Sequence, residues 1–492
     1  MLRTLLFFTL LGLKLQAQQN YFNKRINLAY AENSRSVFQG SNLYVIGSTS
    51  DDGTPHIETR LSAVDSAGNI LWNKAIRSLT INYYAGLVGS FSQSPDGGYI
   101  VGGGVQDTSG DANGAIYRFD ANGDTLWTKV FGDTTFQTFN QCRPTTDGGF
   151  IMVGTTATFD SMHDVWLFKT DSMGGMEWNQ HYGLTNNVTD EGYSVVQTSD
   201  GGYFIGGMRF FRSSLNIDWL LIKTDSLGNE QWEKVFGGQY EDLCWSVSQS
   251  FDGSLIGGGI YTDVLHGLPF DPGDGRLNII KLDTAGNLLW DKKYGPVRYY
   301  PNLYSICSLP DGSIMGAGSC YYDTTTNQTN GIVLKVAGNG DSLWYRNYRL
   351  LMGNNSDNFL YDIKPTSDSG FIATGPVFPL APDTGSISDT WLLKLDSLGC
   401  EISSCWMNVG NMDENQNQVE LQIYPNPSLG LFHIESKVEI ENIKVFNYTG
   451  EIVFSKSGQI SILDLSQNIS GIYFYKIATK ENKVFSGKLI KE

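Results

Sequence analysis

Short apolar runs alternate with turn sequences along most of the chain, with a repeat of about 54 residues. In one recurring pattern Asp-Gly-Gly precedes an apolar run that ends in glycine, as at Asp96, Asp147 and Asp200, with weaker copies from Asp252, Asp311 and Asp368. Glycine supplies the positive φ that hairpin turns need, and aspartate can accept a hydrogen bond from its own turn backbone. Each copy therefore predicts a tight hairpin between two strands.

A second hairpin follows in each repeat, and the stretch from Lys223 to Trp232 shows it most clearly. Gly228 stands where a type I turn with a bulge needs a left-handed residue. The turn positions are Asp65, Asp120, Asp171, Asp225, Asp283 and Asp396, with Ala337 in the remaining copy, and the tryptophans that follow are Trp72, Trp127, Trp178, Trp232, Trp290 and Trp344. A large ring at one place in every repeat favours packing between neighbouring repeats, and a sugar-stacking series is the alternative.

Each repeat thus predicts four antiparallel strands, and seven hairpin copies predict a seven-bladed β-propeller over residues 20–406. The seventh copy has Ser403 where the others have tryptophan. Near the N-terminus, Phe22-Asn-Lys24 imitates Trp72-Asn-Lys74. We therefore expect the strand around Phe22 to pair in the seventh blade, which would remove an exposed sheet edge.

The glycine pair, apolar hairpin and tryptophan resemble kelch and galactose-oxidase-like propellers across residues 20–406 in architecture. The second hairpin also resembles the sialidase Asp-box. Here, however, glycine follows aspartate by three residues rather than two, and tryptophan follows glycine by four rather than three. We interpret it as an analogous turn and not as evidence of glycosidase activity.

The repeat stops after Trp406, and residues 407–418 have the polar composition of a linker. Residues 419–492 contain an ordered set of motif positions: Pro425, Asn426, Pro427, Gly430, Gly471, Tyr473 and Lys488. This segment resembles the type A sorting domain of type IX secretion. The resemblance implies a small Ig-like β-sandwich that is recognised by the outer-membrane translocon, and an accessory Ig-like domain is the alternative. Alternating apolar residues in 443–446 and 472–477 independently predict half-buried strands.

The N-terminus predicts a signal peptide over residues 1–17, with Arg3, an apolar run over residues 5–13 and Ala17 before the cut. That run is about half of the ~20 residues that a membrane span needs. A buried N-terminal strand is the alternative. No later stretch is comparable, so we expect no transmembrane segment in the mature chain. The predicted location is extracellular or on the outer-membrane surface, after export to the periplasm.

Composition limits the partners and suggests one disulfide. The net charge of −17 would repel a polyanion, so we expect no nucleic-acid binding. An exported chain can oxidise its cysteines. Cys400 and Cys405 would lie roughly 16 Å apart on a straight strand, whereas a disulfide needs Cα atoms within about 7 Å. Because the strand pattern already fails at Ser403, we predict that this pair closes a local loop.

Catalytic signatures are missing from the sequence. The five histidines are scattered without metal-binding spacing, and no nucleophile elbow or phosphate loop is present. We therefore predict no catalytic residues, metal site or cofactor. Asp120 to Asp124 resembles the start of a calcium loop, but its counterparts in other repeats indicate a hairpin turn. Acids before the first strand of several repeats could line a channel mouth or bind a cation, although solvated turn acids are our interpretation: Asp190, Glu191, Glu241, Asp242 and Asp357.

The remaining signal is the placement of irregular loops. In a propeller the regular Asp-Gly-Gly and Asp-x-x-Gly turns lie on one face, so the irregular loops lie on the other, where a rigid scaffold can present ligand contacts. The residues predicted for this ligand face are Tyr261, His266, Phe270, Asp271, Tyr299 and Tyr300. The favoured function is a secreted or surface-attached module that binds an extracellular glycan or protein. A secreted hydrolase, lyase or oxidase and a structural adhesion component are the alternatives.

Overall fold

The structure is a computed structural model, and its described residues form β-strands and no helices. The chain divides into two compact units, Met1–Glu401 and Ile402–Glu492, called the ring and the tail below. The predicted signal peptide and linker lie outside the described residues, as do Cys405, His266, Phe270, Asp271, Pro425 and Pro427. The described residues are 21–27, 31–51, 53, 56–107, 110, 112–132, 136–157, 163–184, 187–264, 274–323, 328–352, 356–378, 388–401, 421–424, 426, 428–436, 438–447, 451–480 and 484–491.

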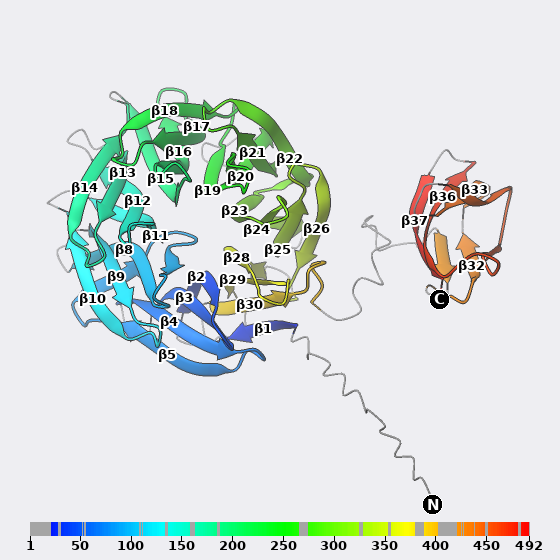
Figure 1. The fold of residues 1–492 in the computed structure, drawn as a ribbon, viewed down its shortest axis with the longest axis horizontal. Helices are drawn as coiled ribbons and strands as arrows, with labels where there is room; N and C mark the ends of the chain where they lie inside the picture. The colour runs from blue at the N-terminus through cyan, green and yellow to red at the C-terminus, as the bar shows by residue number, and fades with distance from the viewer. Residues whose placement is uncertain are drawn as a thin grey trace, which may run out of the picture. The chain divides into compact units, whose positions relative to one another are not determined.

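The ring consists of antiparallel sheets that follow one another around an axis, which is the arrangement of a β-propeller (Figure 1). The described residues form seven such sheets, numbered here in chain order. Sheets 1 to 3 contain β2 (Ala31–Gln39), β3 (Leu43–Asp51), β4 (Ile57–Asp65) and β5 (Ile70–Ile76); β6 (Ile81–Ala85), β7 (Phe91–Gln93), β8 (Tyr99–Asp107), β9 (Ala112–Phe119) and β10 (Thr125–Phe131); and β11 (Gln137–Pro144), β12 (Phe150–Ala157), β13 (His163–Thr170) and β14 (Met176–Tyr182).

The later sheets repeat this order, with the first strand of each innermost in the ring (Figure 1). Sheets 4 to 7 contain β15 (Val188–Gln197), β16 (Tyr203–Phe211), β17 (Asn216–Thr224) and β18 (Glu230–Phe236); β19 (Leu243–Gln249), β20 (Leu255–Val264), β21 (Asp274–Leu282) and β22 (Leu288–Tyr299); β23 (Asn302–Ser308), β24 (Ile314–Asp323), β25 (Gln328–Val336) and β26 (Ser342–Tyr348); and β27 (Asp357–Asn358), β28 (Asp362–Pro365), β29 (Phe371–Phe378), β30 (Asp389–Leu395) and β1 (Phe22–Ile26).

The N-terminal strand β1 closes the ring, as the sequence predicts. It pairs antiparallel with β30, and Phe22 stands opposite Lys394. In sheets 3 to 6 the repeated tryptophan stands opposite the equivalent lysine, for example Trp232 opposite Lys223. Phe22 therefore occupies the tryptophan position of the last sheet, and its imitation of the Trp-x-Lys pattern is structural.

The repeated tryptophans pack between sheets, which confirms the packing interpretation. A Cβ built on Gly228 would lie 2.7 Å from the Trp178 ring, which belongs to the preceding sheet. The corresponding turn glycines of the other sheets meet Trp72, Trp127, Trp232, Trp290 and Trp344 in the same way. Gly228 has a φ of +79°, so the second hairpin places a left-handed glycine where the ring must fit.

The aspartate of each Asp-Gly-Gly hairpin also forms an ion pair with a lysine or arginine of the same sheet. Besides accepting the turn amide of Gly202, Asp200 binds the Lys223 ammonium group at 2.9 Å, and the Lys223 side chain is 1% exposed. Equivalent pairs join Asp96 to Arg118, Asp147 to Lys169, Asp252 to Lys281, Asp311 to Lys335 and Asp368 to Lys394. A buried charge needs such a partner, so the repeat neutralises one cation inside six of its sheets.

Hydrogen bonds join the innermost strands of neighbouring sheets. In four places a backbone amide donates to a polar side chain of the preceding sheet: Phe91 to Ser36, Val195 to Gln141, Val247 to Ser194 and Ile306 to Ser246. At the closure, the Val37 amide donates to the Asp362 carboxylate of sheet 7 at 3.1 Å. The last and first sheets are therefore joined by the same device as the others.

The tail folds as two antiparallel sheets around one apolar core. One sheet has β31 (Leu421–Tyr424), β32 (Leu431–Ser436) and β35 (Ile462–Asp464), and the other has β33 (Ile440–Phe446), β34 (Ile452–Ser457), β36 (Gly471–Thr479) and β37 (Val484–Lys491). Phe432, Val445 and Ile477 from both sheets are fully buried between them. The alternation read from 443–446 and 472–477 therefore predicted these half-buried strands correctly.

Cys400 is buried and disulfide-bonded. Its predicted partner, Cys405, lies outside the described residues, so the pairing remains a prediction. Cys142 and Cys244 are buried free thiols on innermost strands.

Candidate binding surfaces

The innermost strands of the ring share a β-bulge at one position. In β2, β11, β15, β19 and β23 the pairing with the second strand skips a residue. In sheet 7 the innermost strand is interrupted between β27 and β28, and Tyr361 lies in the break. A bulge re-aims a side chain and is common next to functional sites. The residues at this position are Arg35, Asn140, Tyr193, Trp245, Tyr304 and Tyr361.

Four of these residues form a continuous aromatic series, here called the aromatic arc: Tyr193, Trp245, Tyr304 and Tyr361. Tyr193 stacks on Trp245 with ring centroids 5.0 Å apart. Trp245 contacts Tyr304 at 5.5 Å, and Tyr304 meets Tyr361 edge to face at 4.8 Å. Trp245 and Tyr361 are partly exposed, whereas Tyr193 and Tyr304 are buried. The arc therefore crosses four neighbouring sheets and offers an aromatic surface at two of them.

Carboxylates flank one end of the arc. Glu191 accepts a hydrogen bond from the Tyr193 hydroxyl at 3.1 Å, and its other oxygen lies 3.1 Å from Nδ1 of His163. Burial raises the pKa of Tyr300, and the nearby Glu241 carboxylate raises it further. Burial also raises the pKa of the Glu241 carboxyl itself. Carboxylate oxygens at this end can accept hydrogen bonds from hydroxyl groups of a ligand.

Arg35 ends the arc on the other side. Its guanidinium carbon lies 5.7 Å from the centroid of the Tyr361 ring, within the range of a cation–π contact. The arc thus runs from acidic groups beside Tyr193 to a cation beside Tyr361.

Two of the residues predicted for the ligand face lie beside the arc. Tyr300 has a left-handed φ of +49°, and its neighbours include Glu241 and Tyr361. Tyr299 meets Tyr321 edge to face at 5.1 Å. Tyr299 and Tyr300 thus place two further aromatic side chains beside the arc, at the junction of sheets 5 and 6.

Tyr261 belongs to a different environment. Its ring, on β20, lies 4.2 Å from the ammonium group of Lys293, which belongs to the outermost strand β22 of sheet 5. The sequence predicts an irregular loop over residues 258–275 that includes Tyr261, but β20 continues to Val264. Gly258 therefore lies within a strand, where a Cβ would lie 2.5 Å from the Ile306 side chain of the next sheet.

The arc could have been found from the sequence. Each member lies seven positions before its turn aspartate, as Tyr193 does before Asp200 and Trp245 before Asp252. Tyr304 and Tyr361 keep the same distance from Asp311 and Asp368. Reading the repeat for apolar strands hid this series, because tyrosine and tryptophan also suit a core strand.

The described residues that the sequence predicts for the sorting signal lie in two places of the tail. Asn426 is pinned to β37, because its side chain donates to the Lys488 carbonyl at 2.7 Å and accepts from the Ile490 amide at 2.8 Å. Gly430 packs so closely that a Cβ would lie 2.7 Å from Ser466 Cα. The sequence did not single out Lys491, whose ammonium group donates to the carbonyls of Ser466 and Asn468. The start and the end of the motif therefore meet at one edge of the tail.

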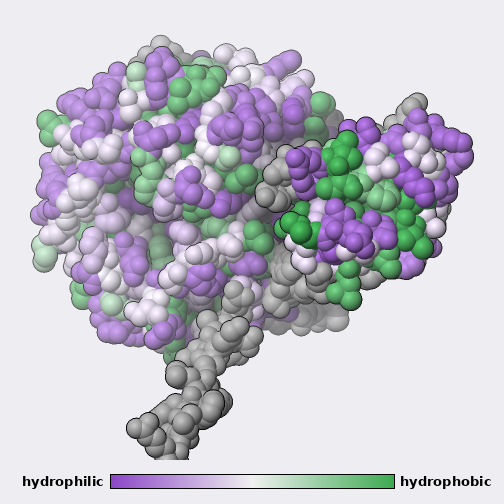
Figure 2. All heavy atoms as spheres, turned by 45° about the vertical axis from the view of Figure 1, so that its right-hand side comes forward, coloured by the Kyte–Doolittle hydropathy of each residue, from purple (hydrophilic) through white to green (hydrophobic). Residues whose placement is uncertain are grey.

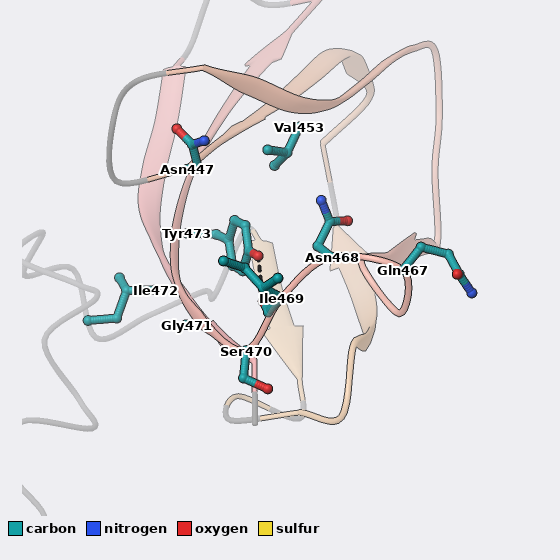
Figure 3. Close-up of a pocket in the computed structure, with 9 residues that line it drawn as sticks. All are labelled: Asn447, Val453, Gln467, Asn468, Ile469, Ser470, Gly471, Ile472 and Tyr473. Atoms are coloured by element: carbon teal, nitrogen blue, oxygen red, sulfur yellow. Dashed lines mark hydrogen bonds between the residues drawn. The ribbon is translucent and has the colours of Figure 1, made fainter.

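Gly471 and Tyr473 line a cavity of about 320 Å³ (Figure 3). Tyr473 points toward Val453 and Asn468, and its hydroxyl donates to the Ile469 carbonyl at 2.6 Å (Figure 3). Gln467 and Ile472 point away from this space. Tyr473 is only 3% exposed, so the Gly-x-Tyr strand positions a core residue beside an accessible hollow.

Other titratable groups have structural surroundings. Asp242 is fully buried and accepts the amides of Gly238 and Thr262, and burial raises its pKa to about 7. Arg209 is held by Asp190 and Glu233. The interpretation as solvated turn acids is therefore wrong for Asp190 and Asp242, which are buried. Asp357 accepts a hydrogen bond from the Thr329 hydroxyl at 2.6 Å, and Glu191 and Glu241 flank the arc. Within the described ranges, no cluster of three or more His, Cys, Asp or Glu side chains is arranged to hold a metal ion.

Residues 422–492 match the family described as secretion system C-terminal sorting domain. This confirms the type IX resemblance of the tail, and it implies interaction with the type IX secretion machinery and export to the cell surface or the extracellular space. Within the described part of the chain, no helix has the length and apolar character of a membrane span.

The chain also has more remote similarities. The regulatory protein FlaEY of Caulobacter vibrioides is 27% identical over 201 residues, which cover 34% of this chain and 21% of that protein. The chain thus spans about a fifth of the length of this relative.

Solved structures with similar architecture include a polysaccharide lyase described as an ulvan lyase, at 9% identity and a TM-score of 0.49, covering 75% of this chain and 96% of the lyase. The Pan2 WD40 domain of Neurospora crassa has 8% identity and a TM-score of 0.41, covering 75% and 89%. The propeller domain of the Pyrococcus furiosus trilobed protease has 8% identity and a TM-score of 0.37, covering 74% and 94%. Similarity at this level carries no activity from one protein to another.

Proposed function

We propose that this is a carbohydrate-binding protein, exported by type IX secretion, whose ring binds a glycan along the aromatic arc. The observation that carries the proposal is the uninterrupted contact series from Tyr193 through Trp245 and Tyr304 to Tyr361. The four side chains, three tyrosines and one tryptophan, occupy equivalent positions of four successive sheets. The same place in other repeats can hold Asn140 or Gly89, so the fold does not require an aromatic residue there.

The chemistry of the arc suits a sugar better than a flat protein surface. Partly exposed aromatic faces can stack against the apolar face of a sugar ring, and a few placed polar groups fix its orientation. Glu191 and Glu241 supply acceptors for sugar hydroxyls at one end. A protein partner and a propeller enzyme are the alternatives, and the same experiment addresses the first of them.

The test is the retention of the full secreted chain on a panel of immobilised polysaccharides, compared with its Trp245→Ala variant. Loss of the exposed indole should weaken retention at least tenfold, because a stacking aromatic contributes on the order of 1–3 kcal/mol to a binding site. Phe251→Ala is the matched control, since Phe251 is 69% exposed at the hairpin turn of Asp252, outside the arc.

Equal losses in both variants, or unchanged retention of Trp245→Ala, would refute the arc as the site. A melting temperature within a few degrees of the wild type would show that Trp245→Ala leaves the ring intact. If no polysaccharide retains the wild-type chain while an extracellular protein does, the protein-binding alternative replaces the proposal.

The export part of the proposal has its own test. Deleting residues 419–492 should leave a folded ring trapped in the periplasm, because the sorting signals lie in the tail. Normal amounts of the truncated chain in the medium or on the cell surface would contradict it. The finer sorting residues are Pro425, Asn426, Pro427, Gly430, Gly471, Tyr473 and Lys488, and changing Asn426 to Ala should reduce export, because Asn426 joins the start of the motif to β37.

We extend the proposal to the domain organisation. The seven sheets correspond to the seven blades of a kelch-like propeller over residues 20–406, and the two sheets of the tail correspond to an Ig-like sandwich. Residues 1–17 act as the signal peptide, and residues 407–418 act as the linker. The continuous pairing order within each sheet supports the blade assignment.

A further inference from the structure

Resting on the proposed glycan function, we infer that the glycan is acidic and that Arg35 binds its carboxylate or sulfate group. Arg35 lies on β2 at the bulge position that tyrosine or tryptophan occupies in sheets 4 to 7. Its guanidinium contacts the last ring of the aromatic arc, Tyr361. A ligand that follows the arc to its end therefore meets this cation.

Unlike Arg209 and the lysines of the hairpin pairs, the partly buried Arg35 lacks an acidic partner in the described part of the chain. In the ranges described, it takes part in no ion pair, and its buried Nε has no hydrogen-bond partner. By contrast, Arg209 pairs with Asp190 and Glu233. Burial lowers the pKa of the Arg35 guanidinium, as it does for Arg143, so the charge is held at a desolvation cost. Such a charge costs folding free energy, so its retention at a binding surface points to an anionic ligand.

Arg143, the other innermost arginine, shows what a satisfied guanidinium looks like here. Its Nη1 donates to the Gly89 carbonyl at 2.9 Å and to the Ser92 hydroxyl at 2.6 Å. Arg143 thus braces the strand break of sheet 2. The Arg35 side chain contacts the Tyr361 ring, its Nε has no hydrogen-bond partner among the described residues, and its planar fork is suited to a carboxylate or sulfate.

The opposite end of the arc fixes the direction of the ligand. Glu191 and Glu241 would repel an acidic group there and would accept hydroxyl donors. An acidic sugar would therefore place its anion at Arg35 and its hydroxyl groups toward Glu191. The net charge of −17 opposes a dense polyanion, whereas a glycan with one acid per few sugars brings a single charge to a single guanidinium.

The test measures the affinity of the full chain for three probes of equal length: an oligogalacturonide, a sulfated oligosaccharide and a neutral cello-oligosaccharide. Arg35→Gln should lose about tenfold or more in affinity for one or both acidic probes, as expected for a lost charge-assisted contact, and less than twofold for the neutral probe. The acidic probe that responds identifies a uronic acid or a sulfate as the anion. Arg77→Gln is the matched control, because Arg77 is exposed outside the arc and the substitution removes the same charge.

Equal losses for acidic and neutral probes would show a structural role for Arg35 and overturn the inference. A wild-type chain that binds neutral and acidic probes alike would overturn it too, while the proposed glycan function stands. If no probe or polysaccharide binds, the proposed function fails and the inference fails with it. Should Arg35→Gln not fold, mass mapping of arginine modification by phenylglyoxal decides: the responding acidic oligosaccharide should protect Arg35 in the wild type, and an unprotected Arg35 would overturn the inference.

Discussion

The ring and the tail are both antiparallel, but they bury their strands in different ways. Strand β12 of the ring is buried at seven of its eight residues, because its sheet packs against a neighbour on each face. Strand β32 of the tail alternates between exposed and buried residues, because its sheet faces one core. The same secondary structure therefore has two sequence patterns, a continuous apolar run in the ring and a period of two in the tail.

The ring and the tail also differ in net charge. Residues 422–492 hold eight lysines and seven acidic residues, so the rest of the chain carries a net charge of −18 within the total of −17. Inside the ring, most buried cations have a carboxylate partner, as Lys223 does in Asp200. The tail also leaves apolar side chains such as Ile452 and Phe474 on its surface, as the ring does at Leu126 and Leu289. Figure 2 shows green hydrophobic areas among purple hydrophilic ones.

The largest expected effect is on the stability of the ring, which depends on the N-terminal strand β1. Deleting residues 21–27 removes Phe22 and Ile26 from the core and exposes the edge of β30. We expect a loss of about 5 kcal/mol or more in the free energy of unfolding of the ring, which is comparable to the whole stability of many domains. Chemical denaturation followed by tryptophan fluorescence measures it.

Deleting residues 422–492 is the matched control, and it should leave the denaturation midpoint of the ring unchanged. If the tail deletion destabilised the ring as much as loss of β1, the two units would not be independent and the comparison would fail.

The sequence could predict the ring because its constraints recur. The left-handed glycine at Gly228, the tryptophan that packs against it and the aspartate of the hairpin each follow from local physics repeated every 54 residues or so. The closing strand was predictable for the same reason, since Phe22 keeps the register of a tryptophan. The tail was predictable from motif order and from its period of two.

The candidate site was less predictable, because it depends on contacts between repeats. Nothing local to β2 shows that Arg35 lies over Tyr361, which is far away in the sequence. Loop length also misled: Tyr261 was placed on a loop, but the strand pair of β20 and β21 extends past its glycines. Sequence periodicity identifies equivalent positions, whereas ring closure decides which of them meet.

The next largest effect is the loss of stability on replacing a glycine that packs against a tryptophan, compared with a glycine of the same sheet that has space around it. Gly228→Ala introduces a Cβ 2.7 Å from Trp178 at a φ of +79°. We expect a loss of about 3 kcal/mol, since a left-handed alanine costs roughly 1 kcal/mol and the displaced ring adds overpacking strain. Gly201→Ala, at a φ of +84° with only Ser226 within 4 Å, should lose about 1 kcal/mol. Similar denaturation midpoints for the two variants would show that the tryptophans do not couple the sheets.

A smaller effect tests the buried acid of the ring. Because burial raises the Asp242 pKa to about 7, the folded state holds a proton that the unfolded state releases above about pH 4. This carboxyl therefore makes the ring less stable as pH rises from about 4 to about 7, and the effect is constant above that. Relative to wild type, Asp242→Asn should gain about 2 kcal/mol in free energy of unfolding between pH 5 and pH 8.

The measurement is urea denaturation at several pH values, with Asp124→Asn, at an exposed turn, as the control. Its curve should run parallel to that of the wild type. Parallel curves for Asp242→Asn as well would mean that the buried carboxyl is ionised throughout.

The smallest effect compares one ion pair from each unit. Asp200→Asn keeps the turn acceptor for the Gly202 amide but removes the charge that faces the buried Lys223 ammonium group. Because Lys223 still donates to the Thr224 carbonyl at 2.8 Å, we expect a loss of about 1–2 kcal/mol rather than the full cost of an orphaned charge. In the tail, Glu439 and Lys480 are 65% and 61% exposed, and Glu439→Gln should change the stability of the tail by less than about 0.5 kcal/mol. Added salt should reduce the stability change caused by Glu439→Gln in the tail. It should leave the change caused by Asp200→Asn in the ring nearly the same, since buried pairs are screened less. Equal costs for the two substitutions would show that the hairpin aspartates of the ring shape turns only and do not neutralise the cations beneath them.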